Sequence, residues 1–430
     1  MRRLSARRLW ACVYLAMFVT AASAQGGADS VLAALSLEEA LVRTVSANPG
    51  LVAFGYQIDA AEGRLRQAQI PPGPELDAAL QDVLGTNTHR GVRSAEATVS
   101  IAWVLERGVR ERRVSAARAG VALRTIDAEI ARLDVAAETA RRFLGCLAFQ
   151  ERLSNAIEAV RLAEETVAAV RARVEAGSAL EAELARAEAG LARAALDQEH
   201  DEHELLSAYH RLSAQWGDTV PDFSSVKGDV TALPGIEPFE ALLARADGNP
   251  ELARYMSRQR LAEAELRVAE ARSRPDWRAS AGLRRVEATD EFVLVGTIAI
   301  PLRTSGRNLG HVAEARADIA RTEAEAVATR IDLETALFVL HQEFNHNLQL
   351  AAGLRDEVIP RLERALTDTR RAYELGRYGY FEWSVVQGEL LQANSDLLEA
   401  SVAAHQVVIE IERLTGVQAA LPPAPQRGVP

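Results

Sequence analysis

The chain has 430 residues, with 49 basic and 60 acidic side chains and a formal net charge of −11. This acidic balance argues against a nucleic-acid partner, which requires a basic surface. A chain of this length normally forms two or three domains, but internal repeats must be sought before domains are counted.

The first 24 residues have the layout of a signal peptide. Four arginines precede an apolar stretch from Leu9 to Thr20, and Ala22-Ser23-Ala24 provides a small-residue cleavage site. Removal of the four arginines leaves 45 basic against 60 acidic side chains, a charge of −15. No later apolar stretch reaches the length of about 18 residues that suggests a transmembrane helix. With Cys146 as its single cysteine, the exported chain can form no internal disulfide, so we expect its stability to come from packing and assembly.

A short phrase occurs twice in the chain. Asn48-Pro49-Gly50-Leu51 and Asn249-Pro250-Glu251-Leu252 are 201 residues apart, and a Glu-Ala-Leu triplet precedes each of them. Asn followed by Pro predicts the end of one helix and the first turn of the next, because proline fits the first helical turn. The doubled phrase indicates a duplication.

The duplication predicts a first structural repeat over 25–217, a linker over 218–236, a second repeat over 237–416 and a proline-rich tail over 417–430. Each repeat is expected to run as helix, β-hairpin and long helical hairpin. The expected β-hairpins cover about 76–105, turning at 85–87, and about 277–302, turning at 287–290. The expected helical hairpins cover about 108–217 and 306–416.

The expected strands alternate apolar and polar residues with a period of two, which gives each strand one apolar face. Strands of this length and pattern are typical of an outer-membrane barrel wall, and the edge of a soluble sandwich is the alternative. Four strands cannot close a barrel, so closure would need more than one chain. The side chains expected to face lipid are Val99, Ile101, Trp103, Trp277 and Leu294. The two tryptophans would lie at the periplasmic level of the membrane, unless they serve ordinary packing.

The long helical regions follow a coiled-coil pattern. In the first repeat, apolar residues recur at alternating steps of three and four from Leu123 to Leu147. The stretch 114–174 would reach on the order of 90 Å as a helix. Gly177 and Gly376 mark the expected hairpin turns, 199 residues apart, because glycine supplies the left-handed backbone that a helix end needs.

The strongest candidate for a metal-binding cluster is 199–204. There His200, His203 and Glu204 could lie on one face of a helix and together bind one divalent ion. A hydrated charge run is favoured instead, since the second repeat has no counterpart. His341 with Asn345 or His346 is a weaker candidate. We find no glycine-rich phosphate loop, zinc-protease motif or nucleophile elbow, so we expect neither an enzyme nor a cofactor.

The layout resembles the TolC-like outer-membrane efflux protein family over about 36–416. The resemblance is carried by the paired Asn-Pro phrases and by the Tyr373-Glu374-Leu375-Gly376 turn with the helix 382–399 after it. The strand exits at 99–113 and 296–310 are most similar to the CzcC-like heavy-metal branch. The first exit has Val104 where the second has Pro301, so half of the usual proline-leucine signal is missing there.

The resemblance implies a mainly α-helical homotrimer in the Gram-negative outer membrane. Its four strands per chain would form one twelve-stranded barrel, and its helices a tunnel through the periplasm. Such a protein is a passive exit duct for substrates, here heavy-metal cations, delivered by a periplasmic adaptor and an inner-membrane pump of the resistance-nodulation-division class. Drugs or secreted polypeptides are alternative cargoes. A periplasmic coiled-coil structural or adaptor protein without a membrane part is the alternative of a different class.

The family also implies roles for the ends of the helical hairpins. The residues expected to contact the adaptor are Gly177, Ser178, Gly376, Arg377, Tyr378 and Gly379. Glu183 and Glu382 are candidates for an acidic tunnel mouth, where a ring of carboxylates would concentrate cations. For Glu183, which lies in a run rich in glutamate and arginine, a solvated helix face is favoured, whereas for Glu382 the two interpretations stay open.

Overall fold

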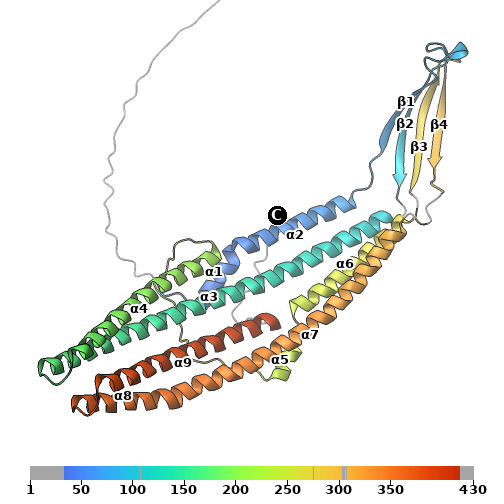
Figure 1. Ribbon diagram of the computed structural model, residues 1–430. Coiled ribbons are helices and arrows are strands. Elements are labelled where there is room, and N and C mark those ends of the chain that lie inside the picture. Colours follow the sequence, from blue (N-terminus) through green and yellow to red (C-terminus); the bar gives the residue numbers. More distant parts are fainter. Residues whose placement is uncertain (1–32, 107, 275, 303–305, 307, 417–430) are drawn as a thin grey trace, which may run out of the picture.

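The computed structural model describes residues 33–106, 108–274, 276–302, 306 and 308–416. The expected signal peptide and proline-rich tail lie outside the described residues. The molecule is elongated: long helices run side by side, and a four-stranded sheet projects from one end of the helical body (Figure 1).

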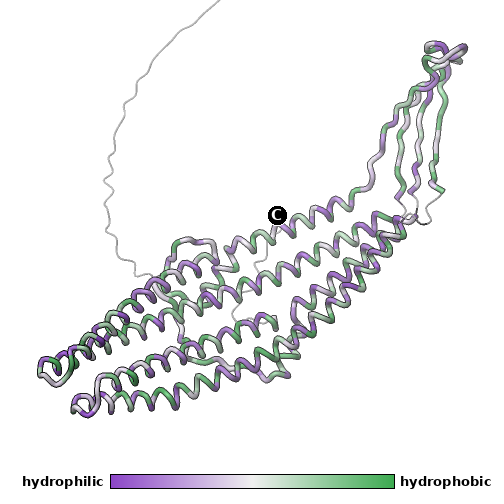
Figure 2. The backbone as a smooth tube through the Cα atoms, in the orientation of Figure 1, coloured by the Kyte–Doolittle hydropathy of each residue, from purple (hydrophilic) through white to green (hydrophobic). Residues whose placement is uncertain are grey.

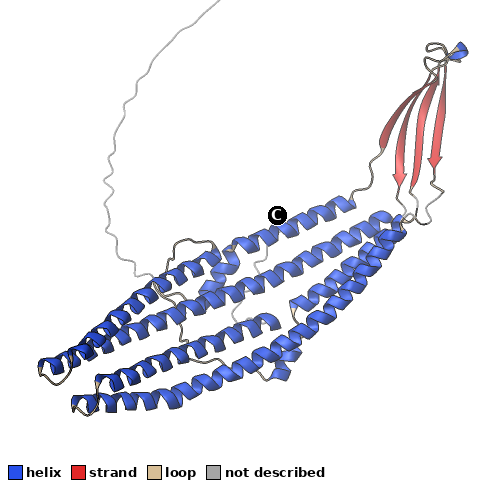
Figure 3. Ribbon diagram, viewed as in Figure 1, coloured by secondary structure: helices blue, strands red, loops and turns tan. Residues whose placement is uncertain are grey.

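The same order of elements appears twice along the chain (Figure 3). The first series is α1 (Leu37–Ala47), α2 (Pro49–Gln69), β1 (Glu75–Gln81), the 3-10 turn η1 (Asn87–His89), β2 (Glu96–Leu105), α3 (Val109–Glu175), α4 (Glu181–Ser213) and the 3-10 turn η2 (Ala214–Trp216). The second series is α5 (Phe239–Ala246), α6 (Pro250–Arg272), β3 (Trp277–Val286), β4 (Glu291–Ala299), α7 (Leu309–Gly353), the π-helical turn η3 (Leu354–Val358), α8 (Ile359–Glu374) and α9 (Tyr380–Thr415).

The repeated Asn-Pro phrases start α2 and α6, as the sequence predicts. The side-chain oxygen of Asn48 accepts a hydrogen bond from the Leu51 amide (3.1 Å), and that of Asn249 accepts one from the Glu251 amide (2.6 Å). Pro49 and Pro250 follow as the first helical residues. Each phrase thus combines a side-chain cap with a proline whose missing N–H is not needed there.

The four strands form one antiparallel sheet in the order β1-β2-β3-β4. The central pair, β2 and β3, joins the two halves of the chain, with Leu105 opposite Trp277 and Glu96 opposite Val286. At Gly282 a Cβ atom would lie 2.3 Å from the Val99 carbonyl oxygen, so the close approach of these strands requires glycine. β1 and β4 are the two edges of the sheet.

The first β-hairpin differs from the prediction. β1 ends at Gln81 rather than near Leu84, because Asp82 and Leu84 have left-handed backbones with φ of 55° and 59°. The predicted tight turn at 85–87 is wrong: a longer loop runs from 82 to 95 and contains η1. Within it the Leu84 amide donates to the Gly91 carbonyl and the Gly85 amide to the His89 carbonyl, both at 2.9 Å.

The long helices of the two series also differ. α3 is continuous over 67 residues and contains no proline. In the second series, η3 separates α7 from α8, and Pro360 is the second residue of α8. Proline lacks an amide hydrogen and its ring crowds the carbonyl four residues earlier, which here is residue 356 within η3. A local π-helical turn accommodates this misfit.

Two apolar clusters hold the middle of the helical body together. One joins α1, α3 and α4 to the linker and includes Phe143, Leu212 and Trp216. The other joins α5, α7 and α9 and includes Leu337 and Phe344. Cys146 lies in the first cluster, where burial raises the pKa of its thiol to about 12.

Polar and apolar residues are interspersed along the helices (Figure 2). Within the described ranges, no helix combines the length and the apolar character needed to cross a membrane.

Candidate functional site

The two helical turns farthest from the sheet lie at the same end of the molecule (Figure 1). Their glycines are left-handed, with φ of 68° at Gly177 and 70° at Gly376. The Gly177 amide donates to the Val174 carbonyl, and the Gly376 amide donates to the Tyr373 carbonyl, both at 2.9 Å. The next residue in each turn bonds back five residues, as in a Schellman motif. Both turns therefore share one backbone design.

Arg173 connects the two turns. Its guanidinium donates to the Tyr373 carbonyl at 2.6 Å and to the Ser178 carbonyl at 3.0 Å, and it lies 4.4 Å from the centre of the Tyr373 ring. Tyr373 is only 1% exposed and packs against Trp383 with ring centres 5.2 Å apart. An ion pair between Arg370 and Glu165 (3.1 Å) adds a second link between the hairpins.

The role of Arg173 is not predicted by the sequence. An arginine in the last turn of a helix is favourable in any protein, so the sequence contains no signal for a contact 200 residues away. Burial also raises the pKa of the nearby Tyr380 phenol. The two turns are therefore held together by buried side chains and by defined hydrogen bonds.

The residues expected to contact an adaptor lie at these turns and are exposed: Gly177, Ser178, Gly376, Arg377, Tyr378 and Gly379. Glu183 and Glu382 occupy equivalent positions, the third residues of α4 and α9. The Glu382 carboxylate accepts a hydrogen bond from the Gly379 amide at 3.1 Å, so it also caps α9. Contact with an adaptor and a role at a tunnel mouth remain predictions.

The sheet places all five residues expected to face lipid on one face. The strand register aligns Leu76 with Ile101, Ile101 with Ala281, and Leu283 with Leu294. Val99, Ile101, Trp103, Trp277 and Leu294 are all exposed. Both tryptophans lie near the end of the sheet that adjoins the helices, since Trp277 pairs with Leu105, two residues beyond Trp103. One face of the sheet is therefore an uncovered apolar surface in the single chain.

Most charged side chains of the strands lie on the opposite face, whereas Arg285, paired with Ala97 and Phe292, lies at the far end of the apolar face. Arg284 donates to the Glu96 carboxylate at 2.6 Å and to the Thr98 hydroxyl at 3.0 Å. Arg278 forms an ion pair with Glu75. The alternation is imperfect in β4, where Val293 lies opposite Arg284 on this charged face.

The histidine cluster shows no shared coordination. His203 lies 3.8 Å from the Glu199 carboxylate, and Glu204 contacts Arg211 at 3.5 Å instead. The Asn345 amide approaches His341 at 3.2 Å. Among the described residues, no group of three or more His, Cys, Asp or Glu side chains could hold a metal ion.

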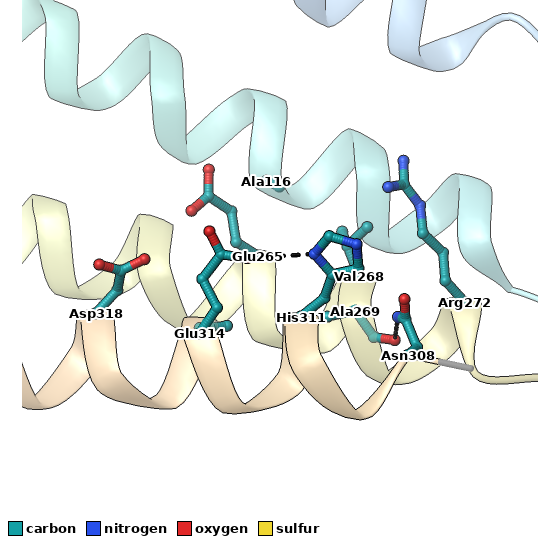
Figure 4. Close-up of a pocket in the computed structure, with 10 residues that line it drawn as sticks. Ala116, Glu265, Val268, Ala269, Arg272, Asn308, His311, Glu314 and Asp318 are labelled. Atoms are coloured by element: carbon teal, nitrogen blue, oxygen red, sulfur yellow. Dashed lines mark hydrogen bonds and ion pairs between the residues drawn. The ribbon is translucent and has the colours of Figure 1, made fainter. Parts of the chain in front are cut away.

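A pocket of about 300 Å³ lies among α3, α6 and α7 (Figure 4). His311 lies 3.2 Å from the Glu314 carboxylate, and both side chains are exposed. Burial raises the pKa of Glu265, and the neighbouring Asp318 and Glu314 carboxylates raise it further. The pocket is therefore acidic, but its side chains do not form a metal site among the described residues.

A repeated chain that carries a sheet with one apolar face on a long helical body has the architecture of an outer-membrane channel protein. Comparison with known proteins agrees. The family model for "Outer membrane efflux protein" matches residues 40–218. The chain is similar to this family over that part of its length, and it is an outer-membrane efflux channel.

Two relatives come from Cupriavidus metallidurans. The cobalt-zinc-cadmium resistance protein CzcC is 28% identical over 383 residues, which are 89% of this chain and 90% of CzcC. The nickel and cobalt resistance protein CnrC is 28% identical over 69% of this chain and 70% of its own length.

Two solved structures share the fold. The outer membrane protein VceC of Vibrio cholerae has a TM-score of 0.71 at 17% identity, over 88% of this chain and 96% of VceC. The MtrE channel of Neisseria gonorrhoeae has a TM-score of 0.69 at 18% identity, over 88% of each chain. The sheet and the helical body therefore have the arrangement of this fold, and the protein is an outer-membrane protein with a long periplasmic portion.

Proposed function

We propose that three copies of this chain assemble into one continuous exit duct. The observation that carries the proposal is the open four-stranded sheet with one exposed apolar face. A membrane sheet with free edges leaves unpaired backbone groups in lipid, whereas β1 of one copy can pair with β4 of the next. Three such sheets supply twelve strands, which is within the range of natural barrels.

The duct conducts heavy-metal cations out of the cell. This cargo is supported by the similarity to cobalt, zinc, cadmium and nickel resistance proteins over most of the chain. The duct itself is passive and catalyses no reaction. An inner-membrane pump of the resistance-nodulation-division class supplies the energy, and a periplasmic adaptor connects that pump to the turns around Gly177 and Gly376.

Glu183 and Glu382 form the cation-attracting mouth of the tunnel. Each lies in the first turn after a hairpin end, and three copies would bring six carboxylates to that level. A ring of like charges raises the local concentration of cations and repels anions.

The cargo is tested by deleting the gene and measuring growth on zinc, cobalt, cadmium and nickel, and on hydrophobic drugs. We expect metal tolerance to fall and a plasmid copy of the gene to restore it. Unchanged metal tolerance with lost drug tolerance would assign the duct to drugs instead. Unchanged tolerance to both, with a secreted polypeptide retained in the cell, would assign it to protein secretion.

A further inference from the structure

The exposed apolar face of the sheet has two different ends. Near the helices it ends at Trp103 and Trp277. At the far end, the last paired row consists of Leu80, Ala97, Arg285 and Phe292, with the Arg285 guanidinium 5.7 Å from the Phe292 ring centre. Eight residues separate Trp277 from Arg285, which is on the order of 20 Å across the membrane for tilted strands. This height approaches the apolar band of about 25 Å found in outer-membrane barrels.

The loop 82–95, here called the outer loop, lies directly beyond that far end (Figure 1). It is folded by the backbone bonds from Leu84 to Gly91 and from Gly85 to His89. It exposes two apolar side chains, with Leu84 84% and Val92 64% exposed. A folded loop that exposes apolar groups next to the end of a membrane face is suited to insertion among lipid headgroups.

The outer loop carries two arginines, Arg90 and Arg93, against one aspartate, Asp82, a formal excess of one positive charge in an otherwise acidic protein. Arg90 and Arg93 are exposed, and neither side chain has an ion-pair or hydrogen-bond partner within the described part of the chain. Arg285, by contrast, is paired with Glu287 at 3.0 Å and with Asp290 at 2.8 Å. Within the described residues, the guanidinium groups of Arg90 and Arg93 are therefore available to an anionic ligand.

We propose that the outer loop binds the phosphate groups of the phosphorylated glycolipid of the outer leaflet, lipid A. Arg90 and Arg93 bind the phosphates, because the guanidinium group matches phosphate oxygens in a two-pronged geometry. Leu84 and Val92 lie among the headgroups and the first acyl carbons. The proposal rests on the proposed contact of the apolar face with lipid.

Native mass spectrometry of the detergent-solubilised full-length protein tests the proposal. Lipid A with both phosphates, lipid A without phosphates and inorganic phosphate are titrated separately. One arginine near an anionic lipid surface strengthens binding about fivefold, so the variant Arg90→Gln/Arg93→Gln should bind phosphorylated lipid A about thirtyfold more weakly. The variant Leu84→Ser/Val92→Ser should also bind it more weakly.

The matched control is Arg118→Gln/Arg260→Gln, which removes two exposed arginines from α3 and α6 and should bind like the wild type. Equal affinity of the wild type and the Arg90/Arg93 variant would overturn the proposal. Equal affinity for lipid A without phosphates, or full competition by inorganic phosphate, would overturn it as well. A wild-type protein that is monomeric in the same spectra would contradict the proposed barrel and not the lipid contact.

Discussion

At the level of single residues, the side chains of Asn48 and Asn249 each form hydrogen bonds with two parts of the chain. Each caps a helix through its side-chain oxygen, and each donates from its side-chain nitrogen to a distant backbone carbonyl. Asn48 reaches Gln215 at 2.7 Å, and Asn249 reaches Leu414 at 2.6 Å. These carbonyls end the returning helices of the same halves, just before the left-handed glycines Gly217 and Gly416. The doubled phrase thus closes each half of the chain on itself.

The double role of Asn249 predicts an unusual response to substitution. Asn249→Ala loses a cap and leaves the Leu414 carbonyl unpaired, so we expect a loss of about 2–3 kcal/mol in the free energy of unfolding. Asn249→Asp keeps the capping oxygen, but it places a carboxylate against that carbonyl. Aspartate and asparagine cap helices about equally, so a pure cap would tolerate this change.

Urea unfolding of the detergent-solubilised protein, followed by tryptophan fluorescence, measures both variants. We expect Asn249→Asp to be at least as destabilising as Asn249→Ala. A stability of Asn249→Asp equal to that of the wild type would show that the bond to Leu414 contributes nothing.

At the scale of elements, the sheet derives its membrane character from its period of two. Residues 99, 101 and 103 lie on the same face as 277 and 294 because the pairing of β2 with β3 and of β3 with β4 aligns the apolar positions of the three strands. A slip of one residue in any pair would turn apolar side chains of one strand toward the charged face. Gly282 helps to hold that register, because a side chain there would collide with β2.

We predict that Ile101→Asp blocks insertion into the outer membrane, because a carboxylate on the lipid-facing surface costs about 2 kcal/mol or more for each chain. The paired control is Arg278→Gln, on the charged face beside Glu75, which should be tolerated. Membrane fractionation and semi-native gel electrophoresis follow both. Normal assembly of the Ile101→Asp protein would show that this face does not contact lipid.

At the scale of the whole molecule, the ends of the two helical hairpins meet through Arg173, Tyr373 and an apolar cluster with Trp383. Equivalent carboxylates, Glu183 and Glu382, follow the two turns. In a symmetric trimer, each would form a ring around the tunnel axis.

We predict that Glu183→Gln reduces the cation selectivity of the reconstituted channel and moves its reversal potential in a salt gradient toward zero. Glu382→Gln should act in the same direction. Glu363→Gln, an exposed change on α8 away from the turn, is the control. A reversal potential that stays at the wild-type value in both variants would remove these carboxylates from the tunnel mouth.

Several features of the fold follow from local patterns of residues. The starts of α2 and α6 follow from Asn-Pro, the hairpin ends from Gly177 and Gly376, and the two faces of the strands from alternation. Each of these features depends on the conformational preferences of residues that are close together in the sequence, so one sequence is enough to predict it. The interruption at η3 was equally readable from Pro360, but the helical periodicity on both sides concealed it.

The contacts between distant groups become visible only in the folded molecule. The bond from Asn249 to Leu414 and the contact of Arg173 with Tyr373 join residues 165 and 200 positions apart, and neither pair has a sequence pattern. The left-handed backbone of Leu84, which creates the outer loop, is equally hidden, because leucine disfavours that conformation in isolation. Such features depend on the free energy of the packed whole, in which distant contacts outweigh local preference.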